Sequence, residues 1–361
     1  MRIGVLGGCG DMGSRTVDLL AHEDDVTQVV VLDRDVAAGQ RRWDGTPGIE
    51  LARVDATDRA GLVRSLEGLD AVASALGPFY RFEVPLASAA VDAGVPYVSI
   101  CDDHEAAAGV LELDDAARQR GIAVLTGLGW TPGLTNLGAR RLYDELGGLD
   151  AVRVFWAGAA SDSSGHAVML HTLYAFDGYV PMSREGLVEL VPAGSGPEPV
   201  HFPDPLGRVE TSYLGHPEPV TLPRFLTGIR RVDLKGGLAE HALDRLARGV
   251  SRVGLTRTHR RRERLASALQ PLLPALESVI ESAPPMSAWR VDAVHEGQQR
   301  SLWGHGRMRD LTGIPLACGA LLLARGGIER TGAFAPEADG VPHARLWELL
   351  ATHGITAQTP G

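Results

Sequence analysis

The sequence predicts an α/β fold in which a doubly wound parallel sheet is interrupted by an inserted α+β domain. Short apolar runs alternate with helical segments over residues 1–127, and a glycine-rich turn follows the first run, which together predict the parallel sheet. This alternation stops after Gly127, and helices resume near the C-terminus, which predicts the insertion. We therefore expect a discontinuous first domain, 1–127 plus 306–361, and a second domain over 128–305.

The first predicted strand is followed by a glycine-rich turn and a helix. The apolar run Ile3–Leu6 leads into three glycines with G-x-G-x-x-G spacing, and apolar residues then recur at helical spacing. In such a turn the first glycine permits a tight bend, the second admits a pyrophosphate and the third lets the helix lie close to the strand. The amides at the helix start face the phosphates. The pattern indicates a Rossmann-type dinucleotide-binding turn, with Gly8, Gly10, Asp11, Met12 and Gly13 as predicted cofactor-binding residues.

The second apolar run, Val29–Leu32, ends in Asp33, about 20 residues beyond the last of these glycines. A carboxylate at this position accepts both ribose hydroxyls of an adenosine, which favours NAD. Arg34 follows it and can either stack on adenine or meet the 2′-phosphate of NADP. The sequence therefore predicts NAD or NADP as cofactor, with NAD preferred and with Asp33 and Arg34 in contact with it.

Later strands and helices of the first domain alternate in the same way. Predicted strands cover 49–54, 71–76, 96–100 and 122–126, and predicted helices cover 59–66, 83–93 and 105–120. Open parallel sheets bind ligands at the carboxyl ends of their strands. Asp55, Gly77 and Pro78 lie there and are predicted to contact the cofactor. Asp102 and Asp103 lie there too and can bind a cationic amine, although one of them is equally suited to cap the next helix.

A different pattern begins after Gly127. The segment Gly129–Asn136 opens a helix that runs to about Leu146, with a proline near its start. Thr135 and Asn136 can hold a substrate carboxylate at this helix start, and helix capping is the equally good alternative for Asn136. Predicted strands follow at 152–156 and 229–234, with a hairpin over 291–303. Few crossover helices are visible, so we expect an antiparallel or mixed sheet.

The composition narrows the class of protein and its partners. Hydrophobic residues make up 44% and charged residues 22% of the 361 residues, as is typical of soluble globular proteins. The net charge of −10 argues against a nucleic-acid or anionic membrane partner, and we interpret the basic run Arg257–Arg264 as the solvated face of a helix over Leu238–Glu281. No apolar run is long enough to span a bilayer, and the first strand already begins at Ile3, so we expect a cytoplasmic protein.

Metal and thiol chemistry have little support in the sequence. The three cysteines form no CxxC pair, which fits a reducing compartment. His166 and His171 have no cysteine or glutamate partner in ligand spacing, so we predict no metal site.

Five segments carry a resemblance to a known family. They are GGCGDMG (7–13), DAGVPYVSICDD (92–103), GLGWTPGLTN (127–136), YLGHPEPVTLPR (213–224) and TGIPLA (312–317). Together they resemble the saccharopine dehydrogenase-like oxidoreductases, most nearly the lysine 6-dehydrogenase-like branch. The resemblance implies hydride transfer at C–N bonds of amino acids and polyamines. It also implies a discontinuous dinucleotide domain and an inserted β-rich domain that forms the substrate pocket and a dimer.

The segment 213–224 supplies the candidate base for such chemistry. A histidine titrates near neutrality, so His216 can take a proton from a substrate amine, although a loop histidine fixed by prolines is the alternative. Asp102 and Asp103 would attract the substrate ammonium, and the predicted substrate-binding residues are Gly129, Thr135, Asn136 and Glu218. The nicotinamide is expected near Gly77–Pro78.

Two functional hypotheses therefore remain open at this stage. The first is an NAD(P)-dependent oxidoreductase acting on an amino acid, amine or imine. The second is a dinucleotide-binding regulatory or sensor protein without hydride chemistry, and absorbance at 340 nm with a panel of amines discriminates between them. We expect a homodimer, formed through an exposed face of the inserted sheet.

Overall fold

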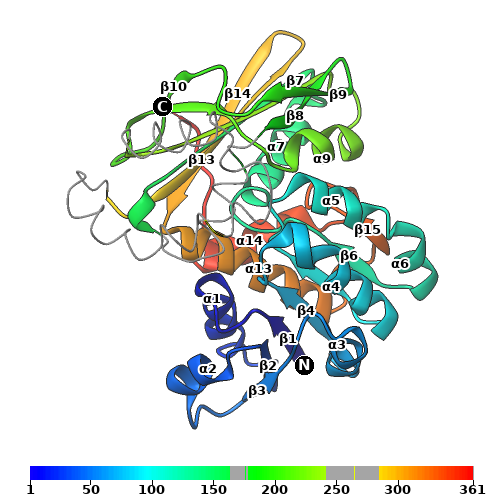
Figure 1. Ribbon diagram of the computed structural model, residues 1–361. Helices are drawn as coiled ribbons and strands as arrows, with labels where there is room; N and C mark the ends of the chain where they lie inside the picture. Colours follow the sequence, from blue (N-terminus) through cyan, green and yellow to red (C-terminus); the bar gives the residue numbers. More distant parts are fainter. Residues whose placement is uncertain (163–174, 176–177, 241–263, 265–283, 361) are drawn as a thin grey trace. The chain divides into compact units, whose positions relative to one another are not determined.

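The computed structural model describes residues 1–162, 175, 178–240, 264 and 284–360. The chain divides into two compact units, Met1–Leu134 with Arg309–Ile355 and Thr135–Met308 with Thr356–Gly361. The first unit thus extends beyond residue 127, and the C-terminal end belongs to the second unit, where Gln358 bridges to Trp303 of β14 (Gln298–Gly306). The chain thus passes from one unit to the other three times, which makes each unit discontinuous in sequence (Figure 1).

The first unit is built on a seven-stranded sheet whose strands are all parallel. Its strands are β1 (Arg2–Leu6), β2 (Gln28–Asp33), β3 (Ile49–Arg53), β4 (Ala71–Ser74), β5 (Tyr97–Ser99), β6 (Ala123–Leu125) and β15 (Gly332–Phe334). They lie in the order β15-β6-β5-β4-β1-β2-β3. The strand order reverses between β1 and β4, which is where doubly wound folds bind ligands. The predicted fold class is confirmed, with β15 as an unpredicted seventh strand.

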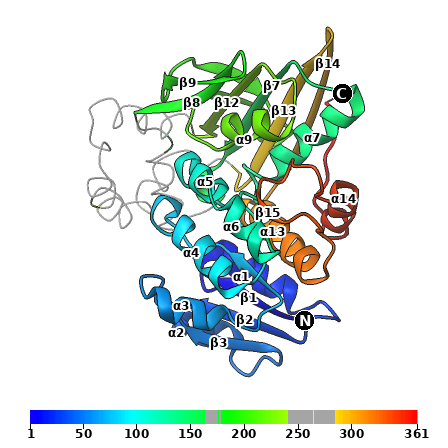
Figure 2. The ribbon, with the colours of Figure 1, turned by 90° about the vertical axis from the view of Figure 1, so that its right-hand side faces the viewer.

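Helices connect these strands (Figure 2). They are α1 (Asp11–Leu20), α2 (Val36–Trp43), α3 (Arg59–Leu66), α4 (Phe79–Ala93), α5 (His104–Leu111), α6 (Asp114–Arg120), α13 (Met308–Ala324) and α14 (His343–Thr352). The prediction of a single helix over 105–120 is wrong, because the chain breaks at Glu112–Leu113. The Asp114 carboxylate accepts the N–H of Ala333 in β15 (2.9 Å), so a tertiary contact fixes the start of a new helix there.

The core of the first unit explains the apolar runs of its sequence. Ile3 and Val5 of β1 and Val29 and Val31 of β2 are fully buried, and Val30 and Leu32, on the opposite face of β2, are almost as deeply buried. A parallel sheet covered on both faces requires such continuous apolar strands. The loops that carry the predicted site residues of the first unit follow the carboxyl ends of these strands.

The second unit contains a mixed sheet in the order β10-β11-β12-β7-β13-β14, with β8 pairing to β12 and β9 pairing to β8. Its other strands are β7 (Ala151–Gly158), β8 (Tyr179–Arg184), β9 (Leu187–Pro192), β10 (Glu198–His201), β11 (Arg208–Tyr213), β12 (Arg231–Leu238) and β13 (Ser287–His295). β7 and β12 are parallel, and the other pairs are antiparallel. The predicted hairpin is present as β13 and β14, joined by a turn at Glu296–Gly297.

Two helices of the second unit carry predicted site residues. They are α7 (Leu134–Leu146) and α9 (Glu218–Phe225). Of the helix predicted over Leu238–Glu281, Leu238 ends β12. Residues 241–263 and 265–281, which contain the basic run except Arg264, lie outside the described residues, as do His166 and His171. No helix in the described ranges combines the length and hydropathy that a bilayer-spanning segment needs.

Candidate functional site

The glycine turn between β1 and α1 shows directly which of its positions must lack a side chain. A Cβ added at Gly13 would lie 2.2 Å from the Gly7 carbonyl oxygen, and one at Gly8 would lie 2.9 Å from Val31 Cγ1. Gly10 is different, because an added Cβ meets only the Gly7 oxygen, at 3.3 Å. The left-handed residue of the turn is Gly7 (φ +71°), one residue before the predicted pattern. Gly8 and Gly13 thus permit close packing, while the space beside Gly10 stays open for a ligand.

The first turn of α1 combines helix amides with a paired charge. Helix geometry leaves the amides of Asp11 and Met12 without intrahelical acceptors, so they suit a phosphate. The Asp11 carboxylate would repel that phosphate, but Arg309 Nε of α13 lies 3.3 Å from Asp11 Oδ1. Arg309 also donates to Ser14 Oγ (3.1 Å). Nothing in the sequence pattern predicts this partner, because the contact joins residues nearly 300 positions apart.

Asp33 is held in place by the glycine turn itself. Its Oδ2 accepts the N–H of Cys9 (3.0 Å), and its Oδ1 accepts the N–H of Asp35 (3.0 Å). A carboxylate oxygen has a second lone pair, so each oxygen can still accept a ribose hydroxyl. Arg34 beside it is exposed. Burial raises the pKa of the Cys9 thiol to about 11, so this cysteine stays protonated and serves as a packing residue.

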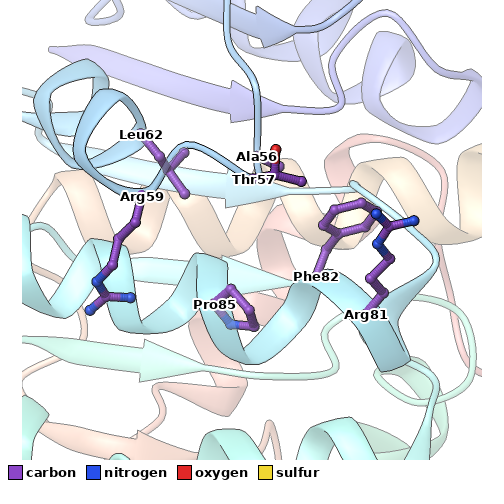
Figure 3. Close-up of a pocket in the computed structure, with 7 residues that line it drawn as sticks. All are labelled: Ala56, Thr57, Arg59, Leu62, Arg81, Phe82 and Pro85. Carbon is purple, nitrogen blue, oxygen red and sulfur yellow. The ribbon is translucent and has the colours of Figure 1, made fainter.

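A pocket of about 220 Å³ lies at the same edge of the sheet, between the starts of α3 and α4 (Figure 3). Its lining is mixed, with four apolar residues, two arginines and one threonine. The lining residues are Ala56, Thr57, Arg59, Leu62, Arg81, Phe82 and Pro85. The guanidinium of Arg81 lies 4.9 Å from the centre of the Phe82 ring. Flat apolar walls with a cation at the rim suit a purine base, so the first unit fits a bound dinucleotide.

Asp55 shapes one wall of this pocket. Its Oδ1 accepts both the hydroxyl (2.7 Å) and the N–H (2.9 Å) of Thr57, and these bonds hold the pKa of Asp55 below its ordinary value. Asp55 therefore fixes the loop that carries Ala56 and Thr57. A direct contact between Asp55 and the cofactor stays a prediction.

The loops after β4, β5 and β6 lie side by side at the carboxyl edge. Pro78 is the N-cap of α4, directly after Gly77. Asp103 Oδ2 accepts the N–H of Tyr80 in the first turn of α4 (2.7 Å). Asp103 is the N-cap residue of α5, but its side chain makes no capping hydrogen bond to that helix. Leu128, which precedes Gly129, donates its N–H to Ser99 O (2.7 Å). Asp102, Asp103 and Gly129 are thus gathered in one part of the first unit.

The second unit buries a cluster of polar side chains where α7 meets α9. Thr135 Oγ1 donates to Glu218 Oε1 (2.8 Å), and Asn136 Nδ2 donates to Thr221 Oγ1 (3.2 Å). His216 Nδ1 lies 3.9 Å from Glu218 Oε2. All five side chains belong to residues that are at most 2% exposed.

The structure shows the surroundings of two residues whose roles the sequence left open. His216 is not a surface loop histidine, since it is only 2% exposed and its ring centre lies 5.7 Å from that of Trp156. Asn136 lies in the first turn of α7, and its side-chain amide donates to Thr221 of α9. Four predicted residues, His216, Glu218, Thr135 and Asn136, therefore meet in space. The other predicted site residues all lie in the first unit.

No group of three or more His, Cys, Asp and Glu side chains within the described ranges is arranged to hold a metal ion. The prediction of no metal stays a prediction, because His166 and His171 lie outside those ranges.

Comparison with known proteins confirms the family-level resemblance. Residues 3–125 match the family model of the saccharopine dehydrogenase NADP binding domain. The whole chain matches the apo histidine-tagged saccharopine dehydrogenase (L-Glu forming) from Saccharomyces cerevisiae, with a TM-score of 0.70 and 17% identity over 100% of both chains. It also matches the homospermidine synthase of Legionella pneumophila in complex with NAD, with a TM-score of 0.62 and 11% identity over 99% of this chain and 91% of that chain. Residues 3–125 are therefore similar to the saccharopine dehydrogenase NADP binding domain, and the chain as a whole shares the fold of the yeast saccharopine dehydrogenase.

Proposed function

We propose that this protein is an NAD(P)-dependent oxidoreductase that transfers hydride at a carbon bearing nitrogen, in an amino acid or an amine. The observation that carries the proposal is the buried cluster of His216, Glu218, Thr135 and Asn136, in a chain that also holds a dinucleotide-binding unit. A protein that only senses a dinucleotide has no use for a second buried polar site. The names of the two similar structures point the same way, since L-Glu and homospermidine both bear nitrogen.

His216 takes the proton of the substrate amine in this proposal. An ammonium has no lone pair, so the nitrogen must lose a proton before it can form the C=N bond as hydride departs. Glu218 Oε2, 3.9 Å from His216 Nδ1, stabilises the imidazolium that results. Thr135 donates to the other Glu218 oxygen and so fixes the carboxylate. We assign to Thr135, Asn136 and Glu218 the binding of the substrate.

The first unit supplies the cofactor in this proposal. The amides of Asp11 and Met12 hold the pyrophosphate, which approaches the backbone at Gly10, and Asp33 and Arg34 hold the adenosine ribose. Gly77 and Pro78 border the nicotinamide, which accepts or donates the hydride when it is bound. Asp102 and Asp103 attract the substrate ammonium to the carboxyl edge of the sheet.

The choice between NAD and NADP is tested at Asp33. Asp33→Ala removes the acceptor for the two ribose hydroxyls, so it should weaken NAD binding by about tenfold or more while weakening NADP binding less. Titration calorimetry with both cofactors measures this, with Asp24→Ala, an exposed residue on the loop before β2, as control. A greater loss of NADP than of NAD would overturn the role of Asp33 and favour Arg34 as a phosphate ligand.

The reaction class is tested by absorbance at 340 nm. We expect the protein to reduce NAD⁺ or NADP⁺ in the presence of a member of a panel of amino acids, diamines and polyamines. The reverse panel pairs 2-oxo acids or aldehydes with amines in the presence of NADH or NADPH. A protein that binds a dinucleotide but is inert with every panel member would instead be the sensor of our alternative hypothesis.

We also propose that the protein forms a homodimer through the β8–β9 hairpin. In the described part of the chain, the exposed large apolar side chains are Tyr179, Leu187, Val188 and Leu190, which all lie in this hairpin. Among the strands that the structure describes, β9 pairs with β8 alone, and we propose that its outer edge pairs with the same strand of a second copy about a two-fold axis. Light scattering should give about twice the 38.3 kDa of one chain, and Leu190→Glu should give the monomer mass. A monomeric wild-type protein at micromolar concentration would contradict the proposed dimer and would leave the proposed reaction unaffected.

A further inference from the structure

Glu83, in the second turn of α4, is a fully buried acid that the proposed mechanism does not use. Its Oε1 accepts hydrogen bonds from Ser99 Oγ (2.5 Å) and Thr126 Oγ1 (3.5 Å), and its Oε2 accepts one from Tyr97 OH (3.1 Å). These donors come from β5 and from the residue that follows β6. The titratable groups that face Glu83 are Tyr97, Cys101 and Asp103. Of these, Asp103 acts on Glu83 through its negative charge.

The Glu83 cluster lies beneath the loops that form the carboxyl edge of the first unit. Ser99 Oγ accepts the N–H of Cys101 (3.4 Å), at the start of the loop that carries Asp102 and Asp103. On the same loop, the Asp103 carboxylate accepts the N–H of Tyr80 in α4 (2.7 Å). α4 and this loop are therefore joined twice, once by the buried acid and once at the edge. α4 begins directly after Gly77–Pro78, where we propose that the nicotinamide binds. Both connections therefore help to position the backbone at that end of the cofactor site.

Burial makes the proton on Glu83 responsive to nearby charge. Desolvation raises its pKa to about 7, and the negative charge of Asp103 adds to this rise, while the three hydroxyl donors oppose it. Both protonation states are thus accessible near neutral pH. A dinucleotide brings the negative charges of its phosphates to the same sheet edge and excludes water from it, and both effects favour the neutral acid further.

We propose that Glu83 is a positioning residue of the dinucleotide site, which holds α4 and the Cys101–Asp103 loop together and takes up a proton from solvent when the dinucleotide binds. The neutral acid donates its proton to a hydroxyl of the cluster and still accepts from the others, so the connection between α4 and β5 is kept. The inference rests on the proposed cofactor site, and it adds a proton-linked residue that touches neither cofactor nor substrate.

Titration calorimetry in buffers of different ionisation enthalpy counts the protons taken up. NADH and NADPH should each be tested at pH 7.5, in phosphate and in Tris. We expect the wild-type protein to take up a fraction of a proton per bound dinucleotide, and its affinity to fall by about threefold to tenfold between pH 6 and pH 9. Glu83→Gln, an uncharged isostere, should bind well with little proton uptake and a flatter pH profile. Glu105→Gln, at an exposed carboxyl on α5, should match the wild type.

Unfolding experiments test the same residue without a ligand. The folded-state pKa of Glu83 is raised above its unfolded value, so its contribution to stability is present in acid and lost as the pH rises toward and through 7. The wild-type unfolding midpoint should therefore fall between pH 5 and pH 8 by more than that of Glu83→Gln. If Glu83→Gln is unstable, Tyr97→Phe removes a donor to the carboxylate and should move the loss to higher pH.

The outcomes separate this inference from the proposed function. If the wild type and Glu83→Gln both bind the dinucleotide and take up equal numbers of protons, the proposed role of Glu83 is wrong, while the proposed function of the protein stands. A wild-type protein that binds neither NADH nor NADPH overturns the proposed function and the inference with it.

Discussion

Gly10→Ala is expected to abolish dinucleotide binding while leaving the fold intact. The added methyl group meets only the Gly7 carbonyl oxygen, at 3.3 Å, and the backbone of Gly10 (φ −73°, ψ 173°) is open to alanine. The protein therefore tolerates the substitution, but the methyl group stands where the pyrophosphate must approach the backbone. Calorimetry measures the loss of binding, and thermal unfolding followed by circular dichroism measures the fold.

Gly13→Ala is the matched control for this experiment. Its Cβ would lie 2.2 Å from the Gly7 oxygen and 2.9 Å from the Gly8 Cα, so α1 must move away from β1. We expect this variant to lose stability as well as binding. The assignment of the turn to the cofactor is wrong if Gly10→Ala binds NAD(H) and NADP(H) like the wild type.

His216→Ala is expected to lower kcat by about 10²-fold, the lower end of general-base effects, without changing cofactor affinity. The variant removes the proton acceptor from the buried cluster and leaves the dinucleotide-binding unit untouched, because His216 belongs to the second unit. Glu218→Gln keeps an oxygen for the Thr135 hydroxyl but removes the charge 3.9 Å from the imidazole, so a smaller loss of kcat is expected. Wild-type activity in the oxidative direction should rise with pH, since the base must be neutral and the amine unprotonated.

Steady-state kinetics on the substrate found in the amine panel decide this prediction. A His216→Ala variant with full kcat would show that His216 is not the proton acceptor, and Asp102 and Asp103 would become the candidates for that role. A loss of kcat with an equal loss of cofactor affinity would instead show that the substitution disturbs the first unit.

The sequence predicts elements whose pattern is local, and it misses those that depend on tertiary contacts. The glycine spacing and the apolar run Val29–Leu32 predict β1, α1 and β2 because each pattern spans only a few residues. β15 is missed because three residues, Gly332–Phe334, carry too little pattern. The break between α5 and α6 is missed because the Asp114 carboxylate bonds to Ala333, 219 residues later in the chain.

In the candidate site too, local sequence signals are predictable and tertiary contacts are not. Sequence reasoning selects residues by their chemical type, such as His216 and Asn136, but it does not reveal their partners. Thr135 meets Glu218 across 83 positions of sequence, so only the fold brings them together. Glu83 lies within a helix whose sequence gives no sign that this one carboxyl is fully buried. A charged residue in a helix is ordinarily solvent-exposed, which is why this group escapes prediction.

Tracing the hydride tests the central claim most directly. The protein is supplied with NADH or NADPH that carries deuterium at the transferred position of C4, together with an amine and a carbonyl compound. We predict that mass spectrometry finds one deuterium on the product carbon that bears nitrogen, and that the oxidised dinucleotide has lost it. A nitrogen-containing product without the label, or label that stays in the dinucleotide, would contradict hydride transfer at a C–N bond.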